Sequence, residues 1–314
     1  MLAIRMTMIP DITYMILNYN PDGEECARDI LEEVIDIFYG RKSKYLKSDV
    51  YLLDQGTTLE HRHWLVEMQG RFGFSTILLN RNIGISRAIN FFVRTCKSPV
   101  IGLITSDALI TSGMDEDLFE KAQIPEVYQA TPFTDKSDVD YQRWQPAEKF
   151  GADGVDMKGL KANRSFFDKI LNRSTPNYLR AIGVELNVMF WRRDVFNKIG
   201  YFDEQWKACY ENNDFSLRCF LGGGCTAVST DSFVWHYHKV TEKNKARDKS
   251  HDGYVADCWP VAIRKLWDDK WPDLDSSINI YKPLKNRSIS DYPGLLQRFE
   301  KNIYLPYEQD IAYD

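Results

Sequence analysis

The sequence predicts an α/β fold with a mostly parallel central sheet flanked by helices, and three observations support this prediction. Short apolar segments alternate with segments of helical spacing through residues 1–111, as expected for strands joined by crossover helices. The segment from Val100 to Thr105 is apolar or glycine except at its last position, as is typical of a buried parallel strand. It leads directly into Asp107, and ligands of open α/β sheets bind beyond the carboxyl ends of such strands.

The first part of the chain is predicted to contain four strands that alternate with three helices. The strands are rich in apolar and aromatic residues, and the helices repeat apolar residues three and four positions apart. In order, we expect a strand over 12–17, a helix over 24–39, a strand over 49–53, a helix over 60–68, a strand over 75–79, a helix over 85–96 and the strand that begins at Val100.

The periodicity weakens after residue 115, although elements can still be assigned. Segment 136–177 is polar and irregular, and loops of this length in a compact domain are usually functional or mobile. The C-terminal tail has aromatic residues and prolines without a clear period. We expect strands over 126–133, 184–191, 225–228 and 232–235, and helices over 194–199, 213–221 and 254–267.

Composition excludes several classes of protein. A formal net charge of -5 argues against a broadly nucleic-acid-binding surface. No apolar run approaches the roughly 20 residues that span a bilayer, so no membrane span is expected. The six cysteines form no C-x-x-C pair, a spacing that fits reduced thiols in a cytoplasmic protein.

Two aspartates stand at strand ends in the first half of the chain. Asp54 follows the second strand and Asp107 the fourth, with the polar glycine loop 82–84 between them. Such a pair suits a nucleotide, because one carboxylate can accept hydrogen bonds from a base or ribose while the other holds a metal ion. Each aspartate taken alone could equally be a turn residue.

Two further groups of polar residues lie in the second half. His236 and His238 alternate after a short strand and so face one side, either as a metal ligand beside Asp107 or as surface residues. Glu211 and Asp214 open a predicted helix. One interpretation is structural, because carboxylates at a helix N-terminus cap the helix and interact favourably with its dipole. The other is that one of the two carboxylates acts as a general base.

Several short motifs occur together in one order along residues 11–240. They are Asn-Tyr-Asn at 18–20, Leu-Leu-Asp-Gln-Gly-Thr-Thr at 52–58, Asn-Arg-Asn-Ile-Gly-Ile-Ser-Arg-Ala-Ile-Asn at 80–90, Ile-Thr-Ser-Asp-Ala at 104–108, Ile-Gly-Tyr-Phe-Asp-Glu at 199–204, Glu-Asn-Asn-Asp-Phe-Ser-Leu-Arg at 211–218 and His-Tyr-His at 236–238. In this order the chain resembles family 2-type glycosyltransferases of the GT-A fold, similar to bacterial rhamnosyl- and glucosyltransferase-like proteins.

The resemblance implies a role for each matching residue. Asp54 would contact the nucleotide base, and Asp107 would be the last carboxylate of the family's D-x-D metal motif, with His236 or His238 as a further ligand of Mn²⁺ or Mg²⁺. The remaining nucleotide-binding residues would be Asn18, Asn20, Asn82, Gly84, Arg87 and Ser106. It also implies a catalytic domain over 1–240, with a nucleotide-binding half over 1–111 and an acceptor half over 112–240, and a C-terminal loop and helical extension over 241–314.

The chain departs from the family pattern at two positions. The first acidic position of D-x-D is Thr105, which leaves Asp107 as the only carboxylate of the motif. The position of the family's usual base is Asn212, and an amide cannot accept the acceptor's proton. Glu211 or Asp214 must then act as the base, and we expect Asp214 to do so.

The predicted function is a metal-dependent, inverting transfer of a sugar from a nucleoside diphosphate sugar, with UDP as the expected nucleotide, to a hydroxyl. The acceptor could be a glycan, a protein, a lipid-linked sugar or a modified nucleic-acid base. Three alternatives stay open. A sugar nucleotidyltransferase is one, although its glycine-rich loop is missing after the first strand, and a dinucleotide oxidoreductase is another, although the only glycine run, 222–224, closes a helix. The third is a non-catalytic protein that binds sugar nucleotides or glycans.

Overall fold

A computed structural model describes residues 9–20, 24–135, 142, 178–206, 210–237, 259–272, 274, 290 and 292–301. Within these ranges the chain folds around one nine-stranded sheet in the order β3-β2-β1-β4-β8-β6-β9-β5, with β7 paired to β9. The strands are β1 (Ile12–Asn18), β2 (Ser48–Gln55), β3 (Ser75–Leu79), β4 (Val100–Thr105), β5 (Ala108–Ile110), β6 (Val127–Thr134), β7 (Tyr178–Ala181), β8 (Val188–Arg192) and β9 (Cys225–His236).

The sheet is parallel through its first half and mixed beyond it. β1 pairs in parallel with β2 and with β4, and β2 pairs in parallel with β3. From β8 onward the pairing is mixed, because β8 runs antiparallel to both β4 and β6 whereas β6 and β9 run parallel. The first four predicted strands and their parallel pairing are therefore confirmed.

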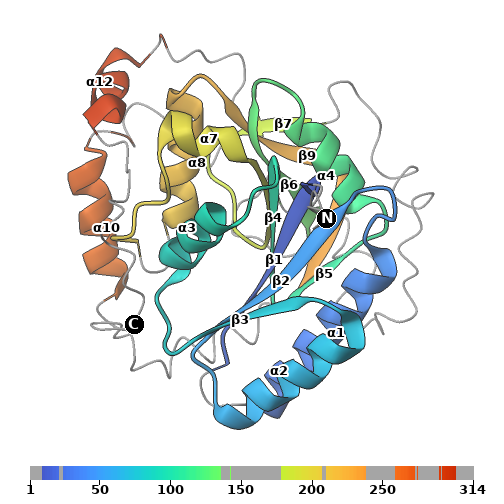
Figure 1. Ribbon diagram of the computed structural model, residues 1–314. Helices are drawn as coiled ribbons and strands as arrows, with labels where there is room; N and C mark the ends of the chain where they lie inside the picture. Colours follow the sequence, from blue (N-terminus) through green and yellow to red (C-terminus); the bar gives the residue numbers. More distant parts are fainter. Residues whose placement is uncertain are drawn as a thin grey trace, which may run out of the picture.

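Helices cover both faces of the sheet (Figure 1). α1 and α2 lie on one side, and α3, α7, α8, α10 and α12 lie on the other. Their bounds are α1 (Glu25–Arg41), α2 (Leu59–Phe72), α3 (Ile85–Thr95), α4 (Met114–Ala122), α7 (Arg193–Ile199), α8 (Glu211–Leu221), α10 (Trp259–Lys270) and α12 (Pro293–Lys301).

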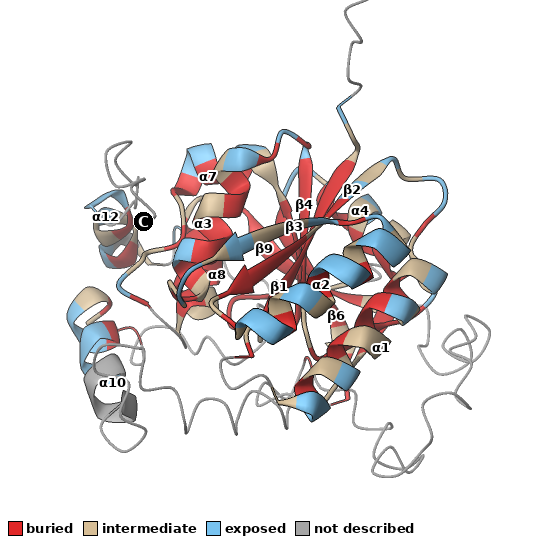
Figure 2. Ribbon diagram, turned by 60° about the horizontal axis from the view of Figure 1, so that its bottom comes forward, coloured by how far each residue is buried: buried red, intermediate tan, exposed pale blue. Residues whose placement is uncertain are grey.

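Alternate residues of β1 divide between two cores, as the period of two along a strand requires. Ile12, Tyr14 and Ile16 pack against buried residues of α1, α2 and α4. Met15 and Leu17 join the other core, with buried residues of α3, α7 and α8. Both layers appear as buried strands and inward helix faces in Figure 2.

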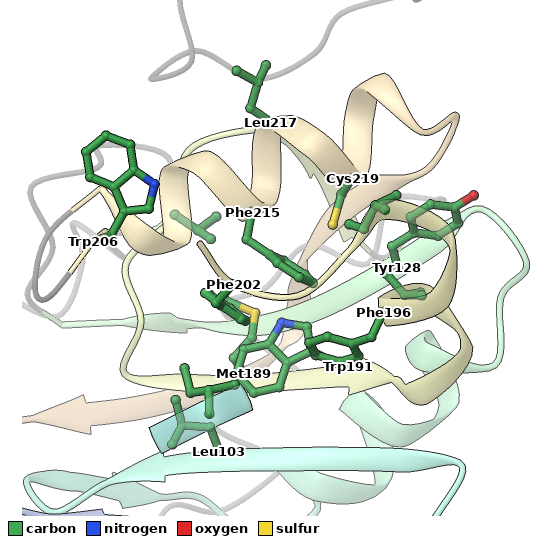
Figure 3. Packing of buried hydrophobic residues seen from close by; sticks show 14 of the residues in the cluster. Leu103, Tyr128, Met189, Trp191, Phe196, Phe202, Trp206, Phe215, Leu217 and Cys219 are labelled. Carbon is green, nitrogen blue, oxygen red and sulfur yellow. The ribbon is translucent and has the colours of Figure 1, made fainter. Parts of the chain in front are cut away.

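The core on the α8 side is built largely from aromatic rings (Figure 3). Phe202 and Phe215 stack with their ring centroids 4.3 Å apart, and Trp191 meets Phe202 edge to face at 5.6 Å. Trp267 and Trp271, from the C-terminal part of the chain, belong to the same core. The C-terminal helix α10 thus packs directly on the sheet domain.

Most predicted elements are observed, and the differences occur where elements are short or merged. The two strands predicted over 225–235 are one continuous strand, β9. The sequence analysis assigned no element to β5, β7, α4 or α12. β5 and β7 have three and four residues, too few to show a period. None of the described helices is long and apolar enough to cross a membrane.

Candidate active site

The carboxyl ends of β1, β2 and β4 meet at one edge of the sheet, as the parallel register requires. Asn18 lies opposite Asp54 in the β1–β2 pair, and Leu17 lies opposite Thr105 in the β1–β4 pair. This edge therefore brings together the polar residues that follow three strands, which is where ligands of open α/β sheets bind.

A buried polar cluster occupies the β1–β2 part of this edge. The amide Nδ2 of Asn18 donates to Oδ1 of Asp54 at 2.8 Å and lies 3.2 Å from Nε2 of His61. The hydroxyl of Thr57 donates to Oδ2 of Asp54 at 2.9 Å. Burial raises the pKa of Asp54 above its ordinary value, although these hydrogen bonds and the Arg62 charge act against the shift.

His61 is neutral at physiological pH. Burial, assisted by the positive charge of Arg28, lowers the pKa of His61 to about 4. Because the nearby Asn18 nitrogen is a donor, the neutral imidazole accepts at Nε2. His61 was not among the predicted site residues, since no motif connects the histidines of this helix to the strand ends.

The loops after β2 and β3 are packed tightly against each other. Gly56 has a φ of +78°, and a Cβ there would lie 2.6 Å from the Cα of Arg81. Oδ1 of Asn82 accepts from the backbone N–H of Gly84 at 2.8 Å, and Oε1 of Gln55 accepts from the N–H of Ile83 at 3.2 Å. The predicted residues Asn82 and Gly84 thus shape a fixed loop beside Asp54.

Asn20, another predicted nucleotide-binding residue just after β1, stabilises the local backbone. Its side chain accepts from the N–H of Glu24 and donates to the carbonyl of Glu24, both at 3.0 Å. These bonds hold the start of α1. Tyr19, between the two buried asparagines Asn18 and Asn20, is only partly buried.

Asp107 and His236 come together across two strands. Ala108 lies opposite His236 in the antiparallel β5–β9 pair, and the N–H of Tyr237 donates to the carbonyl of Asp107 at 2.9 Å. The side-chain atoms Oδ1 of Asp107 and Nε2 of His236 are 3.2 Å apart. Residues separated by more than a hundred positions thus form the pair that the sequence analysis expected.

Acidic groups surround this imidazole. Burial favours the neutral form of His236, but the hydrogen bond and charge of Asp107, together with Glu185 and Asp135, raise the pKa of His236 above its ordinary value. Oδ1 of Asp135 also accepts from the backbone N–H of His236 at 2.9 Å. The site therefore attracts positive charge, whether it is a proton or a metal ion.

A divalent cation fits this pair only if other molecules complete its coordination. One carboxylate oxygen and one imidazole nitrogen are ligands that Mn²⁺ accepts. Across the described residues, no group of three or more His, Cys, Asp or Glu side chains could hold a metal ion. His238, the other predicted ligand, lies outside the described residues, and Mg²⁺ commonly takes its remaining ligands from substrate phosphates and water.

Arg87 and Ser106 lie at the open side of the same edge. Ser106 is partly buried, and its N–H donates to the carbonyl of Leu17 at 3.1 Å. Arg87 is exposed and its Nε lies 3.0 Å from Oε2 of Glu204. Arg87 is thus paired with the loop that follows α7.

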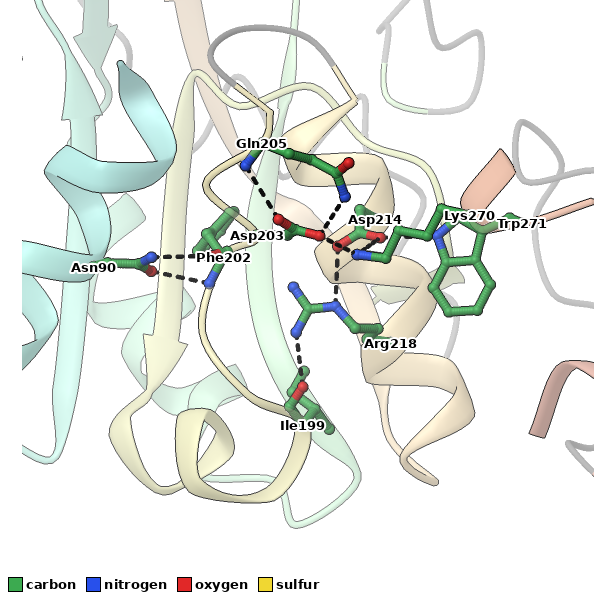
Figure 4. Close-up of polar contacts among 9 residues, drawn as sticks. All are labelled: Asn90, Ile199, Phe202, Asp203, Gln205, Asp214, Arg218, Lys270 and Trp271. Carbon is green, nitrogen blue, oxygen red and sulfur yellow. Dashed lines mark hydrogen bonds and ion pairs between the residues drawn. The ribbon is translucent and has the colours of Figure 1, made fainter. Parts of the chain in front are cut away.

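That loop is fixed to α3 by two buried side chains. Asn90 donates to the carbonyl of Phe202 at 2.8 Å and accepts from its N–H at 2.9 Å (Figure 4). The hydroxyl of Ser86 donates to the carbonyl of Trp206 at 2.7 Å. These contacts hold the chain that leads into α8 against the nucleotide-side helix.

Asp214 is a buried structural anion in this fold. It is wholly buried, its Oδ2 accepts from Nε of Arg218 at 3.0 Å, and its Oδ1 meets Nζ of Lys270 and Nε1 of Trp271, each at 2.8 Å (Figure 4). Lys270 also bonds Asp203 at 2.7 Å. This geometry disfavours the expected role of Asp214 as general base, because an acceptor hydroxyl has no access to it.

The charges around Asp214 also set its ionisation. Burial opposes the charged form, but Arg218 and Lys270, with the Lys270 and Trp271 hydrogen bonds, outweigh it and lower the pKa of Asp214 below its ordinary value. A carboxylate whose charged form is stabilised by its neighbours is a weaker proton acceptor. Two of the three residues that donate to it, Lys270 and Trp271, belong to the C-terminal region, in which no individual site residue was predicted.

Glu211 and Asn212 stand at the first turn of α8. Glu211 is the first residue of the helix and is 7% exposed. The amide Nδ2 of Asn212 donates to the backbone carbonyl of Val184. The amide that replaces the family's usual base thus joins α8 to the segment before β8.

The residue before Glu211 has a strained backbone. Tyr210 has a φ of 63°, the only positive φ outside glycine in the described chain. Its ring packs 5.0 Å from the ring of Trp267 and 6.3 Å from that of Trp206. Such strain persists only where the surroundings impose it, and it is common at functional sites.

Comparisons with known proteins agree with this architecture. The model of the family described as Glycosyl transferase family 2 matches residues 14–200. No curated protein matches the sequence. Among solved structures, the mannosyltransferase PcManGT from Pyrobaculum calidifontis is similar with a TM-score of 0.51 and 13% identity, over 77% of this chain and 61% of that one. GalNAc-T7 is similar with a TM-score of 0.57 and 13% identity, over 95% of this chain and 56% of that one.

The family match and the similar solved structures show the GT-A fold. The chain belongs to glycosyl transferase family 2, because the family model covers more than half of it. It spans about three fifths of the length of the two similar structures.

Proposed function

We propose that this protein transfers a glycosyl group from a nucleoside diphosphate sugar to a hydroxyl acceptor, with inversion at the anomeric carbon and with a divalent cation bound at Asp107 and His236. The family match supports the reaction class. The observation that supports the cation site is the convergence of Asp107 and His236, 3.2 Å apart, at the carboxyl edge of the parallel strands.

The nucleotide would lie along the ends of β1 and β2. Asp54 is wholly buried and accepts from Asn18 and Thr57, so it would position these side chains at the edge on which the base lies and would not contact the base directly. Tyr19, partly buried beside Asn18, offers a ring on which a base could stack. UDP remains the expected nucleotide.

The diphosphate would lie between this cluster and Asp107. A bound Mn²⁺ or Mg²⁺ would neutralise charge on the departing diphosphate. The structures of PcManGT and GalNAc-T7 that resemble this fold contain Mn²⁺ with GDP-Man and with UDP and GalNAc, respectively, which supports this proposal. Ser106, partly buried beside Asp107, and the Asn82–Gly84 loop would line the nucleotide on the other side.

Glu211 is our candidate for the general base in place of Asp214. It opens α8 immediately after the strained Tyr210, whereas Asp214, one turn further, is held inside the protein by Arg218 and Lys270. Only a base at the crevice can take the proton of an acceptor hydroxyl as the hydroxyl attacks, a contribution of roughly 10²–10⁴ in rate.

A donor screen tests the proposal. Purified protein is incubated with UDP- and GDP-sugars, with and without Mn²⁺, and release of the nucleoside diphosphate is measured. We expect Mn²⁺-dependent release from at least one donor, and loss of Mn²⁺-dependent UDP or GDP binding by calorimetry in Asp107→Ala. Release that does not depend on the cation, with unchanged binding in the variant, would remove Asp107 from the site.

The same screen tests the base and the stereochemistry. Glu211→Gln should lower kcat by about 10²-fold while donor binding changes little, because the lost interaction acts in the transition state. Glu67→Gln, an exposed site on α2, is the matched control. NMR of the sugar first released to water identifies its anomer, and retention of configuration would contradict inversion.

A further inference from the structure

Thr105 and Asn187 face each other at the ends of two neighbouring strands. β4 and β8 are antiparallel, with Ile104 opposite Val188, so the next pair in the same register is Thr105 and Asn187. The N–H of Thr105 donates to the carbonyl of Asn187 at 3.0 Å. Side chains of directly opposed residues project from the same face, with Cβ atoms about 5 Å apart.

Both side chains carry a buried polar atom without a partner. Oδ1 of Asn187 accepts from the N–H of Val188 at 2.7 Å, which fixes the amide so that Nδ2 is its other end. Asn187 is wholly buried, and within the described chain neither its Nδ2 nor Oγ1 of Thr105 has a hydrogen-bond partner. Such groups are rare in folded proteins and costly, by about 1–3 kcal/mol each.

The pair is linked through the chain to both the metal pair and the proposed base. Thr105 is two residues before Asp107, and its strand alternation places it with Leu103 on the face covered by α3 and α8. The segment that carries Asn187 starts at Val184, whose carbonyl accepts from Asn212 beside Glu211. We therefore expect a sugar whose diphosphate lies at Asp107 and whose anomeric carbon faces Glu211 to lie near this pair.

We propose that Asn187 and Thr105 bind a hydroxyl of the transferred sugar and so help to select the donor. The proposal rests on the proposed function. A hydroxyl both accepts and donates, so it can satisfy the Asn187 N–H and the Thr105 oxygen together. The pair carries no charge, which suits a sugar hydroxyl better than a phosphate, for which charged partners give stronger bonds.

Matched ligands with and without the sugar test this proposal. Calorimetry in the presence of Mn²⁺ compares UDP with UDP-GlcNAc and GDP with GDP-mannose, for the wild type, Asn187→Ala and Thr105→Val. In the wild type, the sugar nucleotide should bind more tightly than its nucleoside diphosphate. Each variant should reduce that advantage about fivefold while the affinity for the nucleoside diphosphate stays within about twofold.

The outcomes separate this inference from the proposed function. If the wild type binds none of the four ligands, the proposed donor class is wrong, and this inference falls with it. If the wild type binds them but both variants weaken the diphosphate and its sugar form equally, or neither changes the sugar's advantage, the pair does not contact the sugar. Thr105→Val keeps the shape of the side chain, so its unchanged melting temperature guards against a failure of folding.

Discussion

Replacing Asp214 by asparagine should lower the free energy of unfolding without abolishing catalytic turnover. The change keeps the shape of the side chain but removes the charge that faces Arg218 and Lys270. Breaking a buried ion pair by removing one partner costs about 3–5 kcal/mol. Because Lys270 keeps Asp203, and Arg218 keeps the carbonyl of Ile199, we expect the lower figure, about 3 kcal/mol.

Urea unfolding at pH 7, followed by circular dichroism, measures this loss. The matched control is Asp268→Asn on α10, where an exposed pair with Arg264 at 2.9 Å should contribute less than about 0.5 kcal/mol. If Asp214→Asn unfolds within about 1 kcal/mol of the wild type, the buried network is not the stabilising feature that its geometry indicates. A folded Asp214→Asn protein should also keep turnover far above that of Glu211→Gln.

The same variant has a predictable dependence on pH. Since the pKa of Asp214 is lowered in the folded protein, its carboxylate stabilises the fold above the ordinary pKa of about 4, and this contribution is lost as the pH falls further. The difference in unfolding free energy between the wild type and Asp214→Asn should therefore shrink below about pH 4. A difference that stays constant from pH 6 to pH 3 would show that the charge of Asp214 does not contribute.

Three further substitutions test other parts of the site, each by urea unfolding. Asn212→Asp puts an anion against the carbonyl that the amide now binds, so it should cost about 1–3 kcal/mol, whereas Asn213→Asp in the same helical turn should cost little. Gly56→Ala, with φ at +78° and a Cβ 2.6 Å from backbone, should cost more than about 1 kcal/mol, whereas Gly70→Ala in α2, with no atom within 4 Å, should be neutral or stabilising. The wild type should lose unfolding free energy between pH 6.5 and about 4, because the buried imidazole of His61 resists the proton that the unfolded chain accepts. His61→Gln should make this pH dependence weaker, and an unchanged pH dependence would contradict the reasoning.

The sequence predicted the parallel half of the sheet because its strands are buried runs with a clear period. β1, β2, β3 and β4 were all predicted. Because Asn18 and Asp54 end two neighbouring parallel strands, the register of these strands places them side by side. One of His236 and His238 was also predicted to lie beside Asp107, and the contact of His236 depends on the antiparallel β5–β9 pair. In that case the resemblance, not the period, supplied the information, because β5 is only three residues long.

What the sequence did not reveal is which carboxylate of α8 is held in the core by buried cations. Glu211, Asn212 and Asp214 occupy one helical turn, and their spacing is compatible with either acid as the base. The decisive partner, Lys270, lies 56 residues further along the chain, in a helix that no motif connects to the site. Its ammonium converts Asp214 into part of the core, so the assignment of the base depends on a tertiary contact that local pattern cannot predict. If Glu211→Gln retains full turnover while folded Asp214→Asn loses it, this reasoning from burial is wrong.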